Sequence, residues 1–241
     1  MKGKGVFITG TDTGVGKTFI TAAIARFLRD RGMRVGVMKP VTSGCVMIGE
    51  KLVSEDAELL KWASSCTAPD TDIAPYLLKA PLAPSIAASQ EGVQIQFDAI
   101  LQAYQRLEAG HDFVLVEGAG GLLAPLTQDL FIADLCLVLR LPLLVVARPN
   151  LGTVNHTLLT CFCARKLGIK VSGTIINRYP VNPGQPEKYA PEMIASLSGS
   201  PVLGILPQVE GNYETVMIEN LVEAIKRGPL STNLLKELAI A

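Results

Sequence analysis

A glycine-rich run between an apolar segment and a segment of helical period constrains this chain more than any other feature. The run GTDTGVGKT occupies residues 10–18. A cradle for nucleotide phosphates needs inward backbone N–H groups, an ammonium for the β- and γ-phosphates and a hydroxyl for Mg²⁺, all at a helix N-terminus. Gly16, Lys17 and Thr18 supply these groups in order. The run therefore predicts a strand–loop–helix unit that binds a nucleoside triphosphate.

Strand-length apolar runs alternate with helical segments along most of the chain. The predicted strands are Val6–Thr9, Arg34–Met38, Phe113–Glu117, Leu143–Ala147, Val171–Asn177 and Val202–Leu206. The predicted helices are Thr18–Arg31, Phe97–Glu108, Thr153–Leu167 and Pro191–Leu197. Such alternation is typical of right-handed βαβ units and a mostly parallel sheet. We expect one α/β domain over residues 1–241 of the P-loop NTPase type, with loops and short helices at 41–96 covering the active face.

The charge balance and the cysteines limit the possible partners. Lys and Arg number 22, as do Asp and Glu, so nothing predicts binding to nucleic acid or to an anionic membrane surface. The longest apolar stretch, Leu135–Ala147, is interrupted by Arg140 and Pro142, which argues against a transmembrane helix. The five cysteines show no C-x-x-C spacing, and no export signal opens the sequence. We expect a cytoplasmic protein with small-molecule partners.

Polar residues follow the predicted strands at their carboxyl ends, where parallel sheets bind ligands. Glu117 ends an apolar strand beside the phosphate loop and is a candidate ligand of Mg²⁺, which prefers hard oxygens. The glycines of 118–121 leave backbone N–H groups open to an anion.

Lys39 ends another strand, and we expect its ammonium over the same edge. Asp56 has two interpretations, a first-turn helix acid or a ligand. The predicted helix start at 152–155 offers free N–H groups to a carboxylate or phosphate.

These motifs together closely resemble those of the dethiobiotin synthetase family. In the phosphate loop, five residues separate Gly10 from Gly16, where the usual pattern has four. The resemblance is carried, in family order, by this longer loop, KPVTSG at 39–44, VEGAGG at 116–121, LGTVNH at 151–156 and Asn177. It implies an ATP-dependent ligase of biotin biosynthesis that converts 7,8-diaminopelargonate, CO₂ and MgATP to dethiobiotin, ADP and phosphate. A carbamate would attack the γ-phosphate, and the second amine would close the ring on the resulting carbamic-phosphoric anhydride. The resemblance also implies a homodimer.

The resemblance further implies roles for individual residues. Lys17 and Lys39 would be catalytic, with Lys39 neutralising charge between carbamate and γ-phosphate. The implied Mg²⁺ ligands are Thr18, Asp56 and Glu117. The implied nucleotide-binding residues are Thr13, Gly14, Val15, Gly16, Lys17, Thr18, Phe19, Asp56, Glu117, Gly118, Ala119, Gly120, Asn177, Arg178, Pro207, Gln208, Val209 and Glu214, with Asn177 on the adenine edge. The implied substrate-binding residues are Thr13, Lys39 and Ser43 and, across the subunit interface, Gly152, Thr153, Val154 and Asn155.

Two residues depart from the family pattern, and two other functions are alternatives. Gly14 stands where some members have an acidic residue, and Arg178 stands where some relatives have an acid, so use of another nucleoside triphosphate stays open. A switch ATPase of the partitioning type would need a signature lysine five residues before the last loop glycine, where this chain has Thr11. A corrin amidating ligase would need an ammonia source, normally a glutaminase domain for which this chain has no room.

Overall fold

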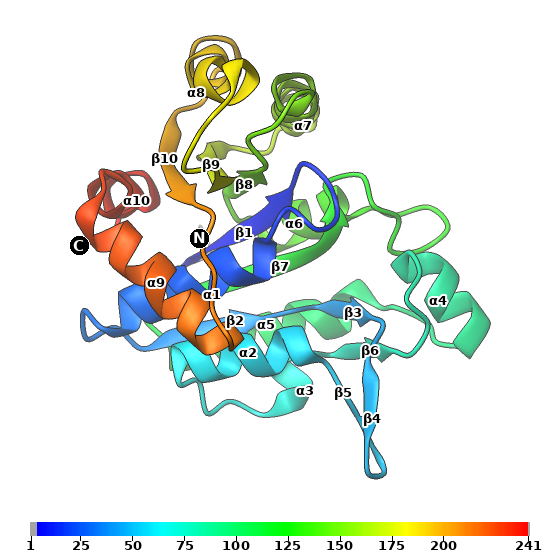
Figure 1. Cartoon of the computed structure of the whole chain (residues 1–241). Helices are drawn as coiled ribbons and strands as arrows, with labels where there is room; N and C mark the ends of the chain where they lie inside the picture. The colour runs from blue at the N-terminus through cyan, green and yellow to red at the C-terminus, as the bar shows by residue number, and fades with distance from the viewer. Residues whose placement is uncertain (1–3, 241) are drawn as a thin grey trace.

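The structure is a computed structural model that describes residues 4–240, and a six-stranded sheet forms its centre (Figure 1). The strands are β1 (Gly5–Gly10), β2 (Val35–Met38), β7 (Phe113–Gly121), β8 (Leu143–Ala147), β9 (Val171–Tyr179) and β10 (Val202–Pro207). Their order is β10-β9-β8-β1-β7-β2, and every neighbouring pair is parallel. The six apolar runs thus form the predicted strands, and the expected mostly parallel α/β fold is confirmed.

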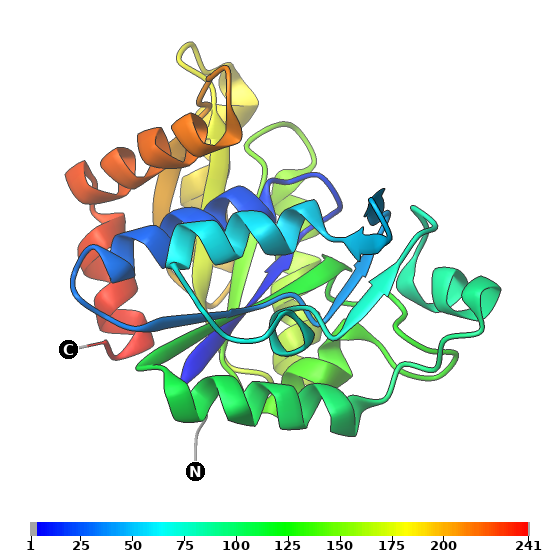
Figure 2. The same cartoon turned by 90° about the horizontal axis from the view of Figure 1, so that it is seen from below.

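Helices cover both faces of this sheet because the chain crosses it in two directions. They include α1 (Lys17–Arg29), α5 (Phe97–Gly110), α6 (Ile132–Leu139), α7 (Thr153–Lys166), α8 (Gln185–Leu197), α9 (Glu214–Arg227) and α10 (Leu230–Leu238). From β1 to β2 the chain moves toward one edge, and from β2 through β7, β8 and β9 it returns to β10 at the other. Right-handed crossovers therefore place α1 on one face and α5 to α8 on the opposite face. Figure 2 shows α1 (blue) and α5 (green) on opposite sides of the sheet.

The position of α1 fixes the loop that precedes it. Ile20, Ile24 and Leu28 are fully buried and recur every four residues, so they form one apolar stripe on the sheet. α9 packs beside α1 on the face away from α5. β1 lies between β7 and β8, with Phe7 opposite Val116 and Leu143. The glycine-rich loop therefore joins the best-supported strand to a firmly packed helix.

The segment 41–96 contains more strand than its sequence predicts. It forms β3 (Val41–Ser43), β4 (Val46–Ile48), β5 (Lys51–Val53), α2 (Glu55–Ser64), α3 (Asp70–Ile73), β6 (Tyr76–Leu78) and α4 (Pro84–Glu91). β3 pairs with β6, and β4 and β5 form a protruding hairpin (Figure 1). Strands of three residues are too short for a recognisable period, and the β3–β6 pairing joins distant parts of the sequence. The expected short helices are present, but the description of the rest as loops is wrong.

Four other helices also differ from the sequence expectations. α6, α9 and α10 are absent from the predicted helices, and α8 begins at Gln185 instead of near Pro191. Pro186 occupies the first turn of α8, where its missing N–H is harmless, and Pro191 is accommodated inside the helix. None of the helices within residues 4–240 has both the length and the apolarity that crossing a membrane requires.

Candidate nucleotide and substrate site

The phosphate loop lines a pocket of about 360 Å³ at the carboxyl ends of β1, β2 and β7. The backbone N–H of Thr11 donates to Val146 O of β8 at 3.0 Å, which ties the loop to the sheet. Gly16 is the N-cap of α1 with a φ of 90°, and a Cβ there would collide with the side-chain amide of Asn177. Only glycine suits both conditions. No side chain caps the first turn of α1, so its N–H groups are available to an anion.

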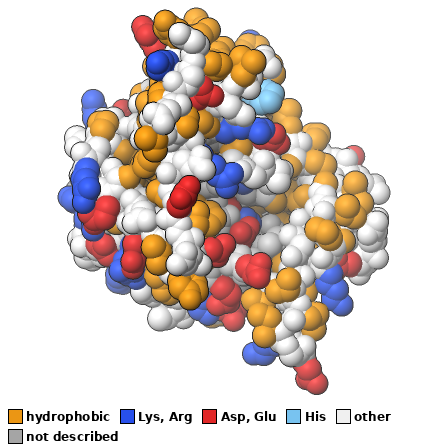
Figure 3. Space-filling model, in the orientation of Figure 1, with side chains coloured by type: hydrophobic (Ala, Val, Ile, Leu, Met, Phe, Trp, Pro, Cys, Tyr) orange, Lys and Arg blue, Asp and Glu red, His pale blue; other side chains and the backbone are white. Residues whose placement is uncertain are grey.

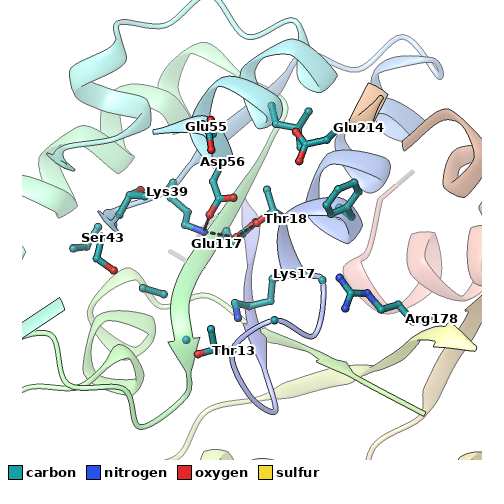
Figure 4. Close-up of a pocket in the computed structure, with 18 residues that line it drawn as sticks. Thr13, Lys17, Thr18, Lys39, Ser43, Glu55, Asp56, Glu117, Arg178 and Glu214 are labelled. Carbon is teal, nitrogen blue, oxygen red and sulfur yellow. Dashed lines mark hydrogen bonds and ion pairs between the residues drawn. The ribbon is translucent and has the colours of Figure 1, made fainter. Parts of the chain in front are cut away.

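A buried lysine joins two carboxylates beside this loop (Figure 4). Lys39 Nζ lies 2.5 Å from Glu117 Oε1 and 2.6 Å from Asp56 Oδ2. Glu117 is fully buried at its place in β7, whereas the Asp56 side chain is 43% exposed. Ser54 accepts a hydrogen bond from the Ala57 N–H at 3.1 Å and so fixes the first turn of α2, which carries Asp56. Three separate elements thus bring one cation and two anions together.

Glu117 leaves one oxygen available to a cation. Its Oε1 also accepts a hydrogen bond from Thr18 Oγ1 at 2.8 Å, but its buried Oε2 has no hydrogen-bond partner among the described residues. A buried carboxylate oxygen without a partner is costly, and a metal ion would satisfy it. The Thr18 hydroxyl and the Glu117 and Asp56 carboxylates are hard oxygen donors that fit Mg²⁺. Within residues 4–240 no group of three His, Cys, Asp or Glu side chains could hold a metal. Mg²⁺ is commonly bound by one or two carboxylates together with phosphate oxygens and water.

The two lysines of the pocket differ in electrostatic environment. Burial lowers the pKa of Lys17, an effect that Glu117 only partly offsets. The Lys17 ammonium donates a 3.3 Å hydrogen bond to the Asp12 carbonyl oxygen. Burial also acts to lower the pKa of Lys39, but Glu117 and Asp56 together outweigh it and raise that pKa. Lys39 is therefore held charged by the protein itself, while Lys17 would gain its counter-charge from a bound anion.

A second pocket of about 310 Å³ lies beside the first. It is lined by Phe19, Asn177, Arg178, Pro207, Gln208, Val209, Met217 and Leu221, and Phe19 and Arg178 line both pockets. Asn177 is buried at the end of β9, and its Nδ2 donates to Val15 O of the phosphate loop at 3.0 Å. The side-chain oxygen of Asn177 makes no hydrogen bond to the loop and can still accept one.

The structure gathers most of the predicted site residues in these two pockets. The predicted residues that line the first pocket are Thr13, Gly14, Gly16, Lys17, Thr18, Phe19, Lys39, Ser43, Asp56, Glu117, Ala119, Gly120, Arg178 and Glu214. Basic and acidic side chains lie close together around the hollow on this face (Figure 3). Gly14 has a φ of 74°, and a Cβ at this position would meet no atom within 4 Å. An acidic side chain would therefore have space at Gly14, but the backbone favours glycine.

Some predicted residues lie outside both pockets, and some lining residues were not predicted. Val15 is buried in the core, and a Cβ on Gly118 would press against Phe7 and Ile132, so both contribute backbone only. The predicted residues 152–155 also line neither pocket. The lining residues missed from the sequence are Val41, Thr42, Glu55 and Leu59 in the first pocket and Met217 and Leu221 in the second. Val41 and Thr42 belong to the KPVTSG motif, and Glu55 stands beside Asp56, which were the available signals. The other three are apolar and carried none.

The start of α7 is linked to the phosphate loop by an arginine. Arg148, just after β8, forms an ion pair with Asp12, and Asp12 Oδ1 accepts a hydrogen bond from the Thr13 N–H at 2.7 Å. The hydroxyl of Thr153, the first residue of α7, donates to Arg148 O. Gly152, the N-cap of α7, makes no side-chain cap hydrogen bond and has a φ of 93°. The starts of α1 and α7 are thus connected through the partly exposed side chains of Asp12 and Arg148.

Sequence relatives carry one name. A family model described as an AAA domain matches residues 4–212. A protein named ATP-dependent dethiobiotin synthetase BioD from Bacillus licheniformis is 43% identical over 210 residues, which cover 86% of this chain and 87% of the relative. The protein of that name from Bacillus subtilis (strain 168) is 41% identical over 215 residues, which cover 89% of this chain and 92% of the relative. A third, from Bacillus cereus (strain G9842), is 41% identical and covers 92% and 95%.

Solved structures with similar folds are more distant in sequence. A ParA family ATPase from Chlorobium tepidum TLS has a TM-score of 0.56 at 14% identity, covering 99% of this chain and 98% of the other. The MinD cell division protein of Aquifex aeolicus has a TM-score of 0.55 at 16% identity, covering 98% and 95%. At such identities the likeness extends to the fold alone, which agrees with the P-loop ATPase architecture.

Proposed function

This chain belongs to the ATP-dependent dethiobiotin synthetase family, and on that premise we propose that it converts 7,8-diaminopelargonate, CO₂ and ATP to dethiobiotin, ADP and phosphate. The observation that carries the proposal is the second buried lysine, Lys39, held 2.5 Å from Glu117 beside the phosphate loop. A switch ATPase of the partitioning type would carry its second lysine inside the phosphate loop, where this chain has Thr11. A reaction that brings a carbamate anion against a γ-phosphate needs further positive charge between them.

The proposed chemistry has three balanced steps. One amine of the substrate adds to CO₂ and loses a proton, which gives a carbamate. A carbamate oxygen then attacks the γ-phosphorus and the bond to the β-phosphate oxygen breaks, which releases ADP and leaves a carbamic-phosphoric anhydride. The second amine attacks the carbonyl carbon and loses a proton as phosphate departs, which closes the ureido ring. Most of the catalysis is then positioning and stabilisation of charge.

The residues around the loop suit these steps. Lys17 holds the β- and γ-phosphates, and Lys39 neutralises charge as carbamate and γ-phosphate meet. Thr18, Asp56 and Glu117 would hold Mg²⁺, which when bound supplies positive charge to the phosphate oxygens. Lys39 contacts both of those carboxylates, at 2.5 and 2.6 Å, so its ammonium lies where the reacting groups and the metal ligands adjoin.

The second pocket is the proposed site of the nucleoside. Since Nδ2 of Asn177 donates to Val15 O, its oxygen is the atom left to accept a hydrogen bond from the exocyclic amine of adenine. The segment Pro207–Val209 lines the same pocket, and Glu214 at the start of α9 lines the first. These positions suit contacts to base and ribose. Lys17 and the proposed base site thus lie on opposite sides of Phe19 and Arg178, which border both pockets.

We also propose a homodimer in which the start of α7 binds the substrate carboxylate of the partner subunit. The uncapped N-terminus of α7 suits an anion but lies outside the chain's own pockets. Large apolar side chains are exposed next to it, with Leu151 85% exposed and Leu159 and Phe162 more than half exposed. Such a surface favours burial against another protein. The five cysteines are unpaired, which supports the proposed cytoplasmic location.

A coupled assay tests the proposal directly. The protein is incubated with 7,8-diaminopelargonate, bicarbonate and MgATP, and both dethiobiotin and phosphate are quantified. We expect one phosphate for each dethiobiotin and almost no phosphate when the diamine is omitted. Equal phosphate release with and without the diamine, and no dethiobiotin, would instead indicate a switch ATPase.

A further inference from the structure

Arg178 has a left-handed backbone conformation at a position that is not the end of a helix. Four non-glycine residues between positions 4 and 240 have a positive φ, and three of them, Ser65, Arg140 and Ala239, are helix C-caps where this conformation is common. Arg178, with a φ of 58°, lies instead within β9. A long side chain in the left-handed region carries steric strain, and strain of this kind concentrates at functional sites.

A bulge in β9 accompanies this strain. Ile176 of β9 pairs with Ile205 of β10, and the next pair joins Tyr179 to Pro207. Two residues of β9 therefore face one of β10, which is the pattern of a β-bulge. Successive residues of a regular strand point to opposite faces, yet Asn177 and Arg178 both line the second pocket. The bulge thus turns Arg178 toward the ligand side of the sheet.

The bulge also places Arg178 at the end of the phosphate loop. Its Nε lies 3.7 Å from the position that a Cβ on Gly16 would occupy, and its side chain points toward the pocket (Figure 4). The hydrogen bond from Asn177 to Val15 O fixes the neighbouring residue to the loop. Backbone N–H groups of such loops surround the α- and β-phosphates, and Arg178 lies on the way from them to the nucleoside pocket. The Arg178 side chain therefore lies between the phosphate loop and the nucleoside pocket.

Two cations of the first pocket are not paired with its carboxylates. Its lining contains three cationic side chains, Lys17, Lys39 and Arg178, and four anionic ones, Glu55, Asp56, Glu117 and Glu214. Lys39 is already paired with two carboxylates. Arg178 makes no hydrogen bond or ion pair with the other pocket residues (Figure 4). Lys17 and Arg178 are therefore the two cations of this pocket that can turn to a polyphosphate.

We propose that Arg178 is a phosphate clamp, whose guanidinium binds the α-phosphate of the nucleotide and whose strained backbone is retained for that purpose. The proposal rests on the proposed function only in that the pocket binds ATP. Arginine suits the role because its N–H groups match phosphate oxygens in pairs. A contact to phosphate is independent of the base. Removal of Arg178 therefore weakens the binding of adenine nucleotides and of guanine nucleotides by the same factor.

Calorimetric titration with ADP, GDP and adenosine in the presence of MgCl₂ tests the clamp. We expect Arg178→Ala to weaken ADP and GDP binding about tenfold each, with adenosine binding changed less than about twofold. The matched control is Arg140→Ala, which removes the same charge from another exposed left-handed position, at the end of α6. It should leave all three affinities unchanged. Unchanged ADP affinity in Arg178→Ala, or a loss for only one of the two bases, would overturn the proposal.

Arg178→Gly separates the clamp from a structural role. Glycine adopts a positive φ without strain, so this variant should melt at the wild-type temperature or above it while ADP affinity still falls about tenfold. Recovery of wild-type ADP affinity in Arg178→Gly would show that the arginine only shapes the bulge and would overturn the clamp. Nucleotide binding is measured without the diamine. Absence of dethiobiotin from the wild-type assay would therefore refute the proposed reaction and leave the clamp standing.

Discussion

The part of the site around the phosphate loop, Lys39 and Glu117, here called the phosphate side, contrasts with the start of α7. Lys39 and Glu117 are buried and contact each other; Lys39 directly follows β2, and Glu117 lies in β7. Gly152 and Leu151 are exposed, and the start of α7 lies outside the two pockets described above. A buried charge requires a fixed partner, so the phosphate side is organised before any ligand arrives. The exposed start of α7 can form a closed binding site only when the surface of another protein covers it.

The largest expected effect comes from Lys39→Gln, which disrupts the organised side. Turnover should fall roughly a thousandfold, since charge stabilisation in the reaction is lost, and the free energy of unfolding should fall by about 3 kcal/mol because Glu117 is left buried without its cation. Urea unfolding and the dethiobiotin assay measure the two effects. Lys61→Gln is the control, since its pair with Asp70 is mostly exposed and should contribute less than about 1 kcal/mol. Equal stability losses in the two variants would remove the distinction between buried and exposed charge.

Glu117→Gln tests whether Glu117, on the phosphate side of the site, is a ligand of Mg²⁺. The Mg²⁺ concentration for half-maximal stimulation of ADP binding should rise between about tenfold and a hundredfold, because one carboxylate ligand becomes a neutral amide. Titration of MgCl₂ at constant ADP measures it. ADP binding in EDTA serves as the internal reference and should change little. If the Mg²⁺ requirement stays at the wild-type value, Glu117 is not a metal ligand.

Leu151→Asp tests the exposed side. A carboxylate at this position should weaken the proposed dimer and raise KM for 7,8-diaminopelargonate roughly tenfold, while ADP affinity stays within about twofold. Sedimentation velocity and steady-state kinetics provide the readouts. Val181→Asp introduces the same charge at a residue that is 87% exposed in the loop before α8, and it should alter neither. A monomeric Leu151→Asp variant with unchanged KM would mean that the α7 start does not bind substrate.

Arg148→Gln affects the link between the two regions and should have the smallest effect. The Asp12–Arg148 pair is partly exposed, so its loss should raise KM for ATP only about threefold, and less at 0.5 M salt than at low salt. Arg34→Gln removes another exposed pair, with Asp112, at the opposite end of the sheet and is the control. A salt-independent increase in KM would indicate that Arg148 contacts the ligand rather than Asp12.

The sequence predicts the sheet and the phosphate side well for the same physical reason. Strands buried on both faces must be apolar throughout, so β1, β7 and β8 are visible as runs, and the polar residue that ends each run marks the ligand edge. Lys39 and Glu117 are found in this way. The contact between them is not predictable from spacing, because it depends on β2 and β7 being neighbours.

The features that the sequence does not predict depend on pairings between distant segments of the chain. No local sequence pattern indicates such pairings. The β3–β6 pair and the bulge at Asn177 and Arg178 arise from strand register, which is a property of two segments at once. The hydrogen bond of Asn177 to Val15 O likewise spans most of the chain. The sequence suggests Asn177 and Arg178 as ligand residues, but not that one would anchor the phosphate loop and the other would occupy a strained position.

The central position of β1 has a consequence for synthesis of the chain. Its partners β7 and β8 begin at Phe113 and Leu143, so β1, the earliest of the three to be synthesised, lacks both neighbours until β8 has been made. At usual rates of translation the apolar β1 waits on the order of ten seconds for both neighbours. During that interval the nascent segment is exposed to chaperones and to other nascent chains. We therefore expect codon choice between β1 and β8 to affect the yield of folded protein.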